Sequence, residues 1–363
     1  MPYTIAEIAS ALEADVVGNK DLVIKALAEP ASAGTDDLAM ASNPKYAEAL
    51  SNGAARAALL WADADWEALG LEAAIRPQRP RFAMSRLTAM MDPGQGYASG
   101  IHPSAVIDPT ATLGADVSVG PNAVIGAGVS IGDRTVIGPL CFVGTSVVLG
   151  ADCFLREHVS IGAYARIGDR FIAQPGVRIA GDGFSFVTPE KGAVETVRET
   201  LGDQGDAQGQ SWARIASLGS VVIGDDVEIG ANSMVDSGTI RATRVGHRTK
   251  MDNLVHLGHN CVVGNDNLLC GSVAVAGSTV TGDFVVMAGQ VGVSDNLTIG
   301  NNVVLGAASK VLSSVPDGKV MLGYPAVEMK THLEGYKSLR RLPRALRDVA
   351  ALKKAVFNAG GSD

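Results

Sequence analysis

The sequence has few aromatic residues, no closely spaced cysteine pair and no excess of positive charge. Only 5% of its 363 residues are Phe, Trp or Tyr, which disfavours a globular core packed around large rings. The four cysteines show no C-x-x-C spacing, so we expect a reduced, cytoplasmic protein. The net charge of −8 gives little to attract a phosphate backbone, and we expect no nucleic-acid partner.

Long apolar runs are also missing. No stretch reaches the roughly 18 uninterrupted apolar residues that a membrane span needs, so we expect no transmembrane segment. The first residues, MPYTIAEIASALEAD, carry early acids and no long apolar run, which is not the pattern of a secretory signal. The length allows two or three domains and a sizeable core.

Glycine, in contrast, is abundant at 43 residues, and much of it belongs to a six-residue repeat. An aliphatic residue recurs every six positions, glycine follows it in most units, and the residue two before it is usually small. Ala173 breaks this run and Ile179 resumes it. The aliphatic positions of the first run are Ile101, Ile107, Leu113, Val119, Ile125, Ile131, Ile137, Val143, Leu149, Leu155, Ile161 and Ile167.

This period predicts a parallel β-helix, because short extended segments alternate with turns and stacked coils bury continuous aliphatic ladders. Glycine permits the backbone angles of a tight corner. Three cysteines fall in the small inward position, so we interpret them as core residues rather than reactive ones. They are Cys141, Cys153 and Cys261.

The repeat is interrupted twice and continues to Val311. It returns at Ile223, then slips by four residues at SGTIRAT, residues 237–243. The longer interruption spans residues 180–220. Extra residues in a solenoid loop out from one face, often the binding face. Within the excursion we expect GDGFSF to be ordered and the polar GDQGDAQGQS to be mobile.

The flanking segments lack the repeat. Residues 1–100 predict a small α/β domain, with a helix in TIAEIASALEAD, a buried strand or short helix in ARAALLWAD, and loop in RPQRPRF. Residues 101–322 then form the β-helix. Residues 323–363 predict a helical tail that Pro343 can split in two. From residue 331 on, the tail has seven Lys or Arg against three acids. It is either a helix with a merely solvated basic face or a docking site for an acidic partner such as an acyl carrier protein.

Two histidines stand out in DNLVHLGHNC, residues 252–261. Positions 18 apart should stack at the same corner of the β-helix, which places His259 beside Gly277. A histidine beside a backbone donor can serve acyl transfer, with the base taking a proton and the amide stabilising an oxyanion. Asp252 could orient the ring. The alternatives are a solvated turn, our interpretation of His158 and His247, or a metal site of His256 and His259, which lacks a third ligand.

Several motifs in chain order resemble the UDP-3-O-(3-hydroxyacyl)glucosamine N-acyltransferases of lipid A synthesis. They are SNPKY at 42–46, HPSAVIDPTATLG at 102–114, GDGFSF at 181–186, VVIGDDVEIGANSMVD at 221–236, MDNLVHLGHNC at 251–261, VAGS at 275–278 and GYPA at 323–326. The resemblance implies a left-handed parallel β-helix with 18 residues per coil. It also implies a homotrimer with its sites between subunits.

The same resemblance implies how the site works. His259 would be the general base, Asp252 its orienting partner and the Gly277 amide the oxyanion donor. Acyl carrier protein would supply a (3R)-3-hydroxyacyl chain to the 2-amino group of a UDP-3-O-acyl-glucosamine, with no cofactor and no metal. Asn43 and Tyr46 would hold the uridine in the N-terminal domain. We also assign His256, Asn260 and Asn296 to the substrate site.

The sequence departs from the family pattern at three positions. Asn296 replaces an expected histidine, Met40 an aromatic residue, and Ser237 an arginine. Asn296 can still hydrogen-bond a phosphate or sugar, but it carries no charge. The alternatives are a related acyltransferase with another acceptor or carrier, and a non-catalytic or metal-binding β-helix protein.

Overall fold

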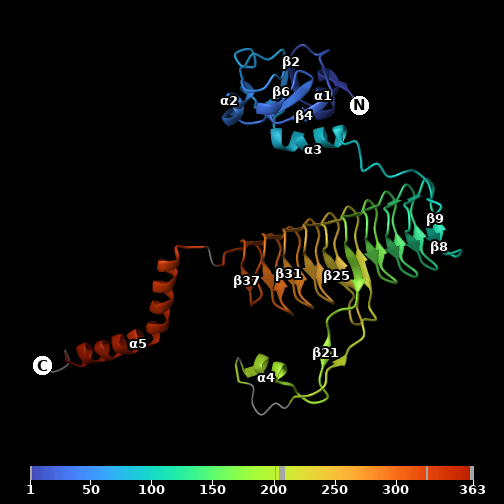
Figure 1. Cartoon of the computed structure of the whole chain (residues 1–363). Helices are drawn as coiled ribbons and strands as arrows, with labels where there is room; N and C mark the ends of the chain where they lie inside the picture. Colours follow the sequence, from blue (N-terminus) through green and yellow to red (C-terminus); the bar gives the residue numbers. More distant parts are fainter. Residues whose placement is uncertain (1, 201, 204–208, 324–325, 360–363) are drawn as a thin grey trace. The chain divides into compact units, whose positions relative to one another are not determined.

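The computed structural model describes residues 2–200, 202–203, 209–323 and 326–359. They belong to two compact units, residues 1–97 and 98–363 (Figure 1). Within the described ranges no helix has both the length and the apolar character needed to cross a membrane.

The N-terminal unit is a five-stranded sheet with helices on it. Its helices are α1 (Ile5–Leu12), α2 (Ala47–Leu50) and α3 (Pro80–Met91). The strand order is β2 (Asp15–Gly18), β7 (Ala73–Arg76), β6 (Ala57–Leu60), β5 (Asp37–Ala41) and β4 (Ala26–Ala28), and only the β2–β7 pair is antiparallel. Alternate residues of β6 face opposite cores, with Leu59 packed in the α1 and α3 cluster and Leu60 in the α2 cluster.

Local chemistry explains where these elements begin. Thr4 caps α1 through a capping box with Glu7, as TIAEIASALEAD predicts. ARAALLWAD forms the buried strand β6. The loop expected over RPQRPRF is wrong in its second half, because Pro80 opens α3 at the first helical position. The fixed φ of proline suits that position, where the missing N–H is not needed.

The second unit is a parallel β-solenoid with three sheets, which confirms the predicted fold class. Sheet I holds β8 (Val106–Ile107), β11 (Val124–Ile125), β14 (Phe142–Val143), β17 (Ser160–Ile161), β20 (Arg178–Gly181), β25 (Met234–Asp236), β28 (His256–Leu257), β31 (Ala274–Val275), β34 (Gly292–Val293) and β37 (Lys310–Val311). Sheet II holds β9 (Thr112–Leu113), β12 (Ser130–Ile131), β15 (Val148–Leu149), β18 (Arg166–Ile167), β23 (Val221–Ile223), β26 (Thr243–Val245), β29 (Val262–Val263), β32 (Val280–Thr281) and β35 (Thr298–Ile299). Sheet III holds β10 (Ser118–Val119), β13 (Val136–Ile137), β16 (Phe154–Leu155), β19 (Ile172–Ala173), β24 (Glu228–Ile229), β27 (Lys250–Met251), β30 (Leu268–Leu269), β33 (Val286–Met287), β36 (Val304–Leu305) and β38 (Val320–Met321).

Each coil visits sheets I, II and III in turn, and the three corners between them carry the turns. In most turns one residue is left-handed, with φ between 55° and 64°. In most of the two-residue strands the second residue points inward and is buried, as in the ladder of Leu257, Val275 and Val293. The three inward cysteines are buried as predicted, and burial raises the pKa of each thiol to about 11.

The two sequence interruptions leave the solenoid at the same corner. The excursion lies between β20 in sheet I and β23 in sheet II, and the slip lies between β25 and β26 of the next coil. Val235 pairs with Leu257 and Leu257 with Val275, so the coil after the slip carries the next I–II corner. That corner holds His259.

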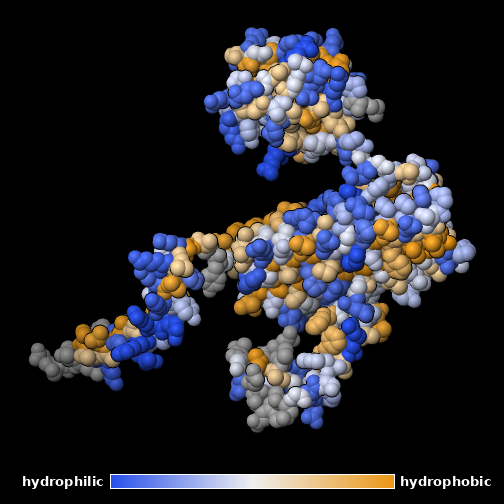
Figure 2. Space-filling model, in the orientation of Figure 1, coloured by the Kyte–Doolittle hydropathy of each residue, from blue (hydrophilic) through white to orange (hydrophobic). Residues whose placement is uncertain are grey.

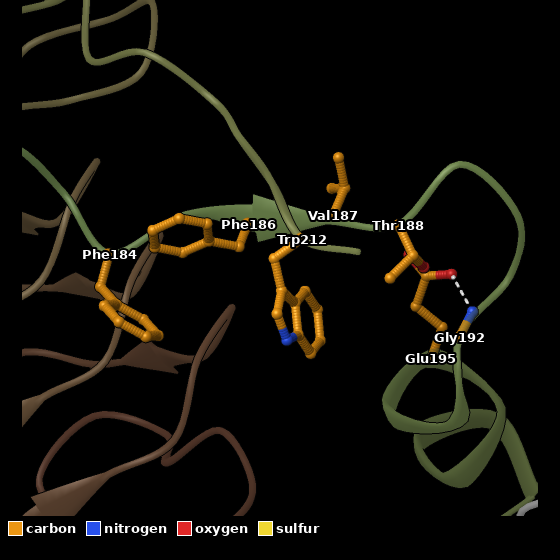
Figure 3. Close-up of a pocket in the computed structure, with 7 residues that line it drawn as sticks. All are labelled: Phe184, Phe186, Val187, Thr188, Gly192, Glu195 and Trp212. Carbon is orange, nitrogen blue, oxygen red and sulfur yellow. Dashed lines mark hydrogen bonds between the residues drawn. The ribbon is translucent and has the colours of Figure 1, made fainter. Parts of the chain in front are cut away.

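The excursion has its own structure. It contains the antiparallel hairpin of β21 (Phe186–Val187) and β22 (Ala213–Arg214), and the helix α4 (Ala193–Thr200) (Figures 1 and 3). The Arg214 guanidinium lies 4.8 Å from the ring centroid of Phe186. The expected order of GDGFSF is confirmed by its place in β20 and β21, whereas half of GDQGDAQGQS, residues 204–208, lies outside the described residues.

The tail is a single helix, α5 (Met329–Ala359). It continues through Pro343 with a bend along its length (Figure 1), so the prediction that Pro343 can split the tail into two helices is wrong. Proline removes one backbone hydrogen bond and crowds the preceding turn, which bends a helix without ending it when the rest of the helix is favourable. Apolar and polar residues both lie on its exposed surface (Figure 2).

Candidate active site

The I–II corner stacks four short segments above the excursion's first residues. They are the slip at residues 237–242, then His259 and Asn260, then Gly277 and Ser278, and then Asp295 and Asn296. Backbone hydrogen bonds join the last three, from Ser278 N to His259 O and from Asn296 N to Gly277 O. The candidate site is therefore built on rigid, hydrogen-bonded turns.

The His259 ring lies directly against Gly277, as the 18-residue spacing predicts. A Cβ added to Gly277 would come within 2.8 Å of both Cε1 and Nε2 of His259. Glycine is therefore required here by the ring and not by the backbone, since the φ of Gly277 is outside the left-handed region. The Nε2 edge of the ring faces the backbone of the next coil.

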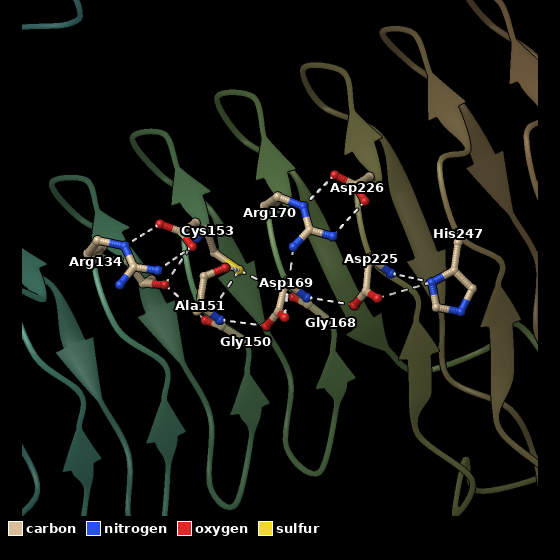
Figure 4. Close-up of polar contacts among 12 residues, drawn as sticks. Arg134, Gly150, Ala151, Cys153, Gly168, Asp169, Arg170, Asp225, Asp226 and His247 are labelled. Carbon is tan, nitrogen blue, oxygen red and sulfur yellow. Dashed lines mark hydrogen bonds and ion pairs between the residues drawn. The ribbon is translucent and has the colours of Figure 1, made fainter.

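The amide of Gly277 donates no hydrogen bond within the described part of the chain. At the II–III corner, side chains from the next coil occupy the corresponding amides. Asp169 accepts from the Ala151 N–H at 2.8 Å, and His247 Nδ1 accepts from the Asp225 N–H at 2.9 Å (Figure 4). An unused N–H beside an imidazole can stabilise a developing oxyanion.

Asn260 determines which nitrogen of His259 carries the proton. Its side-chain Nδ2 donates to the Arg241 carbonyl at 3.2 Å, so its Oδ1 is free to accept. That oxygen accepts from Thr239 Oγ1 at 3.0 Å and lies 2.9 Å from His259 Nδ1. Nδ1 must therefore be the protonated nitrogen, which leaves the lone pair of Nε2 available as a base.

The four-residue slip supplies the groups that hold Asn260. The N–H of Thr239 also donates to Asn260 Oδ1 at 3.2 Å, and the Arg241 guanidinium donates to the Asn260 carbonyl at 3.1 Å. Thr243 Oγ1 accepts from the Asn260 N–H at 2.9 Å. The sequence marks the slip but not these contacts, because they depend on a left-handed turn at Asn260, whose φ is 62°.

The excursion covers the other side of His259. A Cβ on Gly183 would lie 2.6 Å from the Cβ of His259, so Gly183 allows the excursion to pack against it. The Gly183 N–H donates to Ser217 Oγ at 2.9 Å, which ties the two ends of the excursion together. A cavity of about 390 Å³ results, lined by Phe184, Ser185, Phe186, His259, Ala276, Gly277, Ser278, Asp295 and Asn296.

Asp252 does not orient His259 within one chain, which corrects the sequence expectation. It lies at the III–I corner after β27, so β28 separates it from His259 at the I–II corner. Its Oδ1 accepts from the Asn253 N–H at 2.7 Å, and it lines a different cavity with Lys250, Glu228 and Gln174. The seven residues from Asp252 to His259 include one strand, β28, so the two side chains lie at different corners.

Comparisons with known proteins agree with this fold and site. Residues 21–90 match the family model of UDP-3-O-(3-hydroxymyristoyl) glucosamine N-acyltransferase, and residues 99–133 match six hexapeptide repeats of bacterial transferases. The chain is 61% identical over its whole length to the UDP-3-O-acylglucosamine N-acyltransferase of Ruegeria pomeroyi, all of which it covers. The chain belongs to the UDP-3-O-acylglucosamine N-acyltransferase family.

Other relatives extend this result. The family member from Paracoccus denitrificans is 56% identical over 98% of this chain and 97% of its own length. A crystal structure of an Arabidopsis UDP-N-acetylglucosamine acyltransferase has a TM-score of 0.51 at 23% identity, over 62% of this chain and 71% of that one. At that identity it supports the solenoid fold alone.

The family-model match lies in the N-terminal unit and includes Asn43 and Tyr46. Asn43 is exposed and caps the short helix Pro44–Tyr46, with its Oδ1 accepting from the Lys45 N–H at 3.1 Å. Tyr46 is half-buried beneath the Lys45 ammonium, which lies 4.8 Å from its ring centroid. Met40 packs partly buried against the core of the unit.

His256 points outward from sheet I and pairs with Asp236. Its Nε2 lies 3.1 Å from the Asp236 carboxylate, which is largely buried at 15% exposure. The hydrogen bond from Asp236 raises the pKa of His256. Sequence reasoning missed Asp236, because the slip shifts the spacing of the coils that bring the pair together.

Asn296 lines the His259 cavity, where its Nδ2 donates to the Asp295 carboxylate at 3.0 Å. Its φ of 59° also suits asparagine, which tolerates left-handed turns better than most residues. Across the described ranges, no three His, Cys, Asp or Glu side chains cluster closely enough to hold a metal ion.

Proposed function

We propose that this protein transfers a 3-hydroxyacyl chain from acyl carrier protein to the 2-amino group of UDP-3-O-acyl-glucosamine in lipid A synthesis. The observation that carries the proposal is the open Nε2 of His259 beside the unused amide of Gly277. Family membership supports the reaction class and the acceptor. The proposed site residues are His259, Gly277, Asn260 and Asn296, with His256 at the edge.

The chemistry follows from the protonation state. As the neutral amine attacks the thioester carbonyl, Nε2 of His259 takes its proton and the ring becomes an imidazolium. The positive ring is held by its Nδ1–H bond to Asn260, while the Gly277 N–H stabilises the oxyanion. Collapse forms the amide, breaks the carbon–sulfur bond and returns the proton from Nε2 to the carrier thiol.

Asp252 has a place in this reaction if the protein is a homotrimer with sites between subunits. Asp252 is exposed, and its Oδ2 makes no hydrogen bond within the described part of the chain. Gly271 lies beside it, because a Cβ added to Gly271 would be 3.2 Å from Oδ2 of Asp252. We expect the III–I corner of one subunit, with Asp252, to face the I–II corner of its neighbour.

The carrier and the nucleotide are assigned to the two ends of the chain. The exposed Lys and Arg of α5 favour an acidic acyl carrier protein by charge complementarity. Asn43 and Tyr46 offer an amide and a half-buried ring to a uracil base, whereas Met40 packs on the opposite face of the sheet from Tyr46. A cytoplasmic location agrees with four free cysteines.

The test is mass spectrometry of products from acyl carrier donors. The acceptors are UDP-3-O-acyl-glucosamine, which offers an amine, and UDP-N-acetylglucosamine, which offers a hydroxyl. We expect amide product from the first only, and a loss of about 10²- to 10⁴-fold in His259→Ala. Wild-type turnover in that variant would refute the assignment, and ester product alone would indicate the related O-acyltransferase.

The trimer is tested by complementation. Asp252→Ala and His259→Ala are each expected to be inactive, and their co-expression should restore activity in mixed trimers that hold intact sites. Native mass spectrometry checks that mixed trimers form. Mixed trimers without any recovered activity would contradict a site that is shared between subunits.

A further inference from the structure

The His259 cavity also contains a carboxylate, that of Asp295. Asp295 is half-buried and lies at the same I–II corner, two coils beyond His259 and one coil beyond Gly277. The Asn296 N–H donates to the Gly277 carbonyl at 3.0 Å, which fixes the turn that carries Asp295. Neither the proton transfer at His259 nor the oxyanion contact at Gly277 uses this carboxylate. Its place in the cavity therefore points to another part of the substrate.

Asp295 and Asn296 together present hydrogen-bond acceptors to the cavity. The Asp295 carboxylate accepts from Ser294 Oγ at 3.3 Å and from Asn296 Nδ2 at 3.0 Å. Because a carboxylate can only accept, it turns the nitrogen of the Asn296 amide towards itself and directs the amide oxygen away. A negative charge beside a carbonyl oxygen suits O–H donors. The same pair repels a phosphate, which is itself an anionic acceptor.

The spacing between His259 and Asp295 matches one sugar ring. Neighbouring strands lie about 4.8 Å apart, so the backbones of the two turns are separated by about 10 Å. Gly277 lies between them and has no side chain, which leaves room for a ring in the cavity. When the 2-amino group of a glucosamine lies at His259 Nε2, the 4- and 6-hydroxyl groups on the far side of the ring extend towards Asp295.

From this geometry we infer that Asp295 binds the 4- and 6-hydroxyl groups of the acceptor sugar, an inference that rests on the proposed function. The same contact orients the nucleotide. C1 of the sugar carries the diphosphate and lies across the pyranose ring from C4, so a carboxylate at the C4 end keeps the diphosphate at the opposite end of the cavity. Asn296 then contacts a sugar hydroxyl group and not a phosphate.

Binding of deoxy analogues tests the assignment without turnover. Calorimetry measures the Kd of UDP-3-O-acyl-glucosamine and of its 4-deoxy and 6-deoxy analogues in the absence of donor. At least one analogue should bind the wild type about tenfold more weakly, the lower end for a bond to a charged group, because Asp295 is half-buried. Asp295→Ala should bind all three compounds alike, and Asp295→Asn, which keeps the shape without the charge, should give an intermediate difference. Asp116→Asn, which changes an exposed carboxylate on a II–III turn, is the matched control and should keep the wild-type difference.

Steady-state kinetics distinguishes the acceptor from the donor. Asp295→Ala should raise the acceptor KM and leave kcat and the donor KM within about twofold of the wild type. A rise in the donor KM alone would place the carboxylate against the donor's pantetheine arm and overturn the assignment. Analogues that bind the wild type as tightly as the parent compound, or a difference that survives in Asp295→Ala, would also overturn it. If the expected binding differences appear but no amide forms, the proposed function fails while the binding assignment holds. A wild type that binds none of the three compounds would overturn both.

Discussion

Asn260→Gly tests whether Asn260 is the positioning residue for His259. Glycine adopts the left-handed φ of 62° without strain, so the change removes the side chain and little else. It breaks the bonds of the amide to His259 Nδ1, to Thr239 and to the Arg241 carbonyl. The ring then loses both its fixed tautomer and its orientation.

The expected loss follows from one hydrogen bond. In the ground state, the Nδ1–H bond to Asn260 joins two neutral groups, and in the transition state the donor is an imidazolium. A bond to a charged group contributes about 1.5–3 kcal/mol and one between neutral groups about 0.5–1.5 kcal/mol, so the difference of about 1–1.5 kcal/mol should lower kcat by about 5- to 13-fold. The KM values should stay within about twofold, because Asn260 is 9% exposed and absent from the cavity lining.

The assay is steady-state kinetics across pH, with melting as a stability control. Leaving Thr239 N–H and the Arg241 carbonyl without their partner should cost about 1–3 kcal/mol. Asn302→Gly is the matched control, since it has the same turn geometry with φ 55° and is exposed. Asn260→Asp should keep most activity, because its carboxylate can still accept the Nδ1–H bond of His259.

Three results would refute this reasoning. Unchanged kcat in Asn260→Gly would show that the ring is oriented by something else. An equal loss in Asn302→Gly would trace the effect to the turns in general. A change in KM alone would make Asn260 a substrate contact, since an interaction made only in the transition state lowers kcat.

Other positions give independent tests. Gly277→Ala should displace the His259 ring and lower kcat by about 100-fold with little effect on melting. Gly289→Ala, whose added Cβ would only make an ordinary contact with the Gly271 carbonyl oxygen at 3.6 Å, should be neutral in both assays. Thr281→Val should raise the melting temperature by a few degrees, because the buried Thr281 hydroxyl has no partner in the described structure; a lower value would contradict this. Asp236 raises the pKa of His256, so the pair stabilises the fold at low pH, where the imidazole is protonated. That stabilisation is lost as the pH rises through the raised pKa of His256. Asp236→Asn should therefore cost more stability at about pH 5.5 than at about pH 8.5, and by less than about 1 kcal/mol, given the exposure of His256; equal losses would show that the pair contributes nothing.

The repeat predicted the parts of the site that depend only on stacking. Because paired strands in uninterrupted coils are 18 residues apart, the neighbour of His259 could be counted from the sequence as Gly277. The same counting identified the buried cysteines. It works because each coil contacts only its neighbours and no distant segment can intervene.

Counting failed where the direction of a side chain mattered. Asp252 and His259 are close in sequence, but a strand between them turns each to a different corner. Asn260, adjacent to His259, is its actual partner, because a left-handed residue points its side chain back along the turn. Asp236 was missed for a related reason, since its pairing with His256 spans the slip.

The position of the two interruptions explains why the site lies at one corner only. A solenoid repeats its corners, so every coil offers a turn of similar shape at the I–II position. Only the coil with His259 is preceded by both the excursion and the slip, which supply Gly183 on one side and Thr239 on the other. Insertions at either of the other corners would have left the histidine on a bare, solvated turn. The insertions therefore distinguish His259 from turn histidines elsewhere in the solenoid, such as His158 and His247.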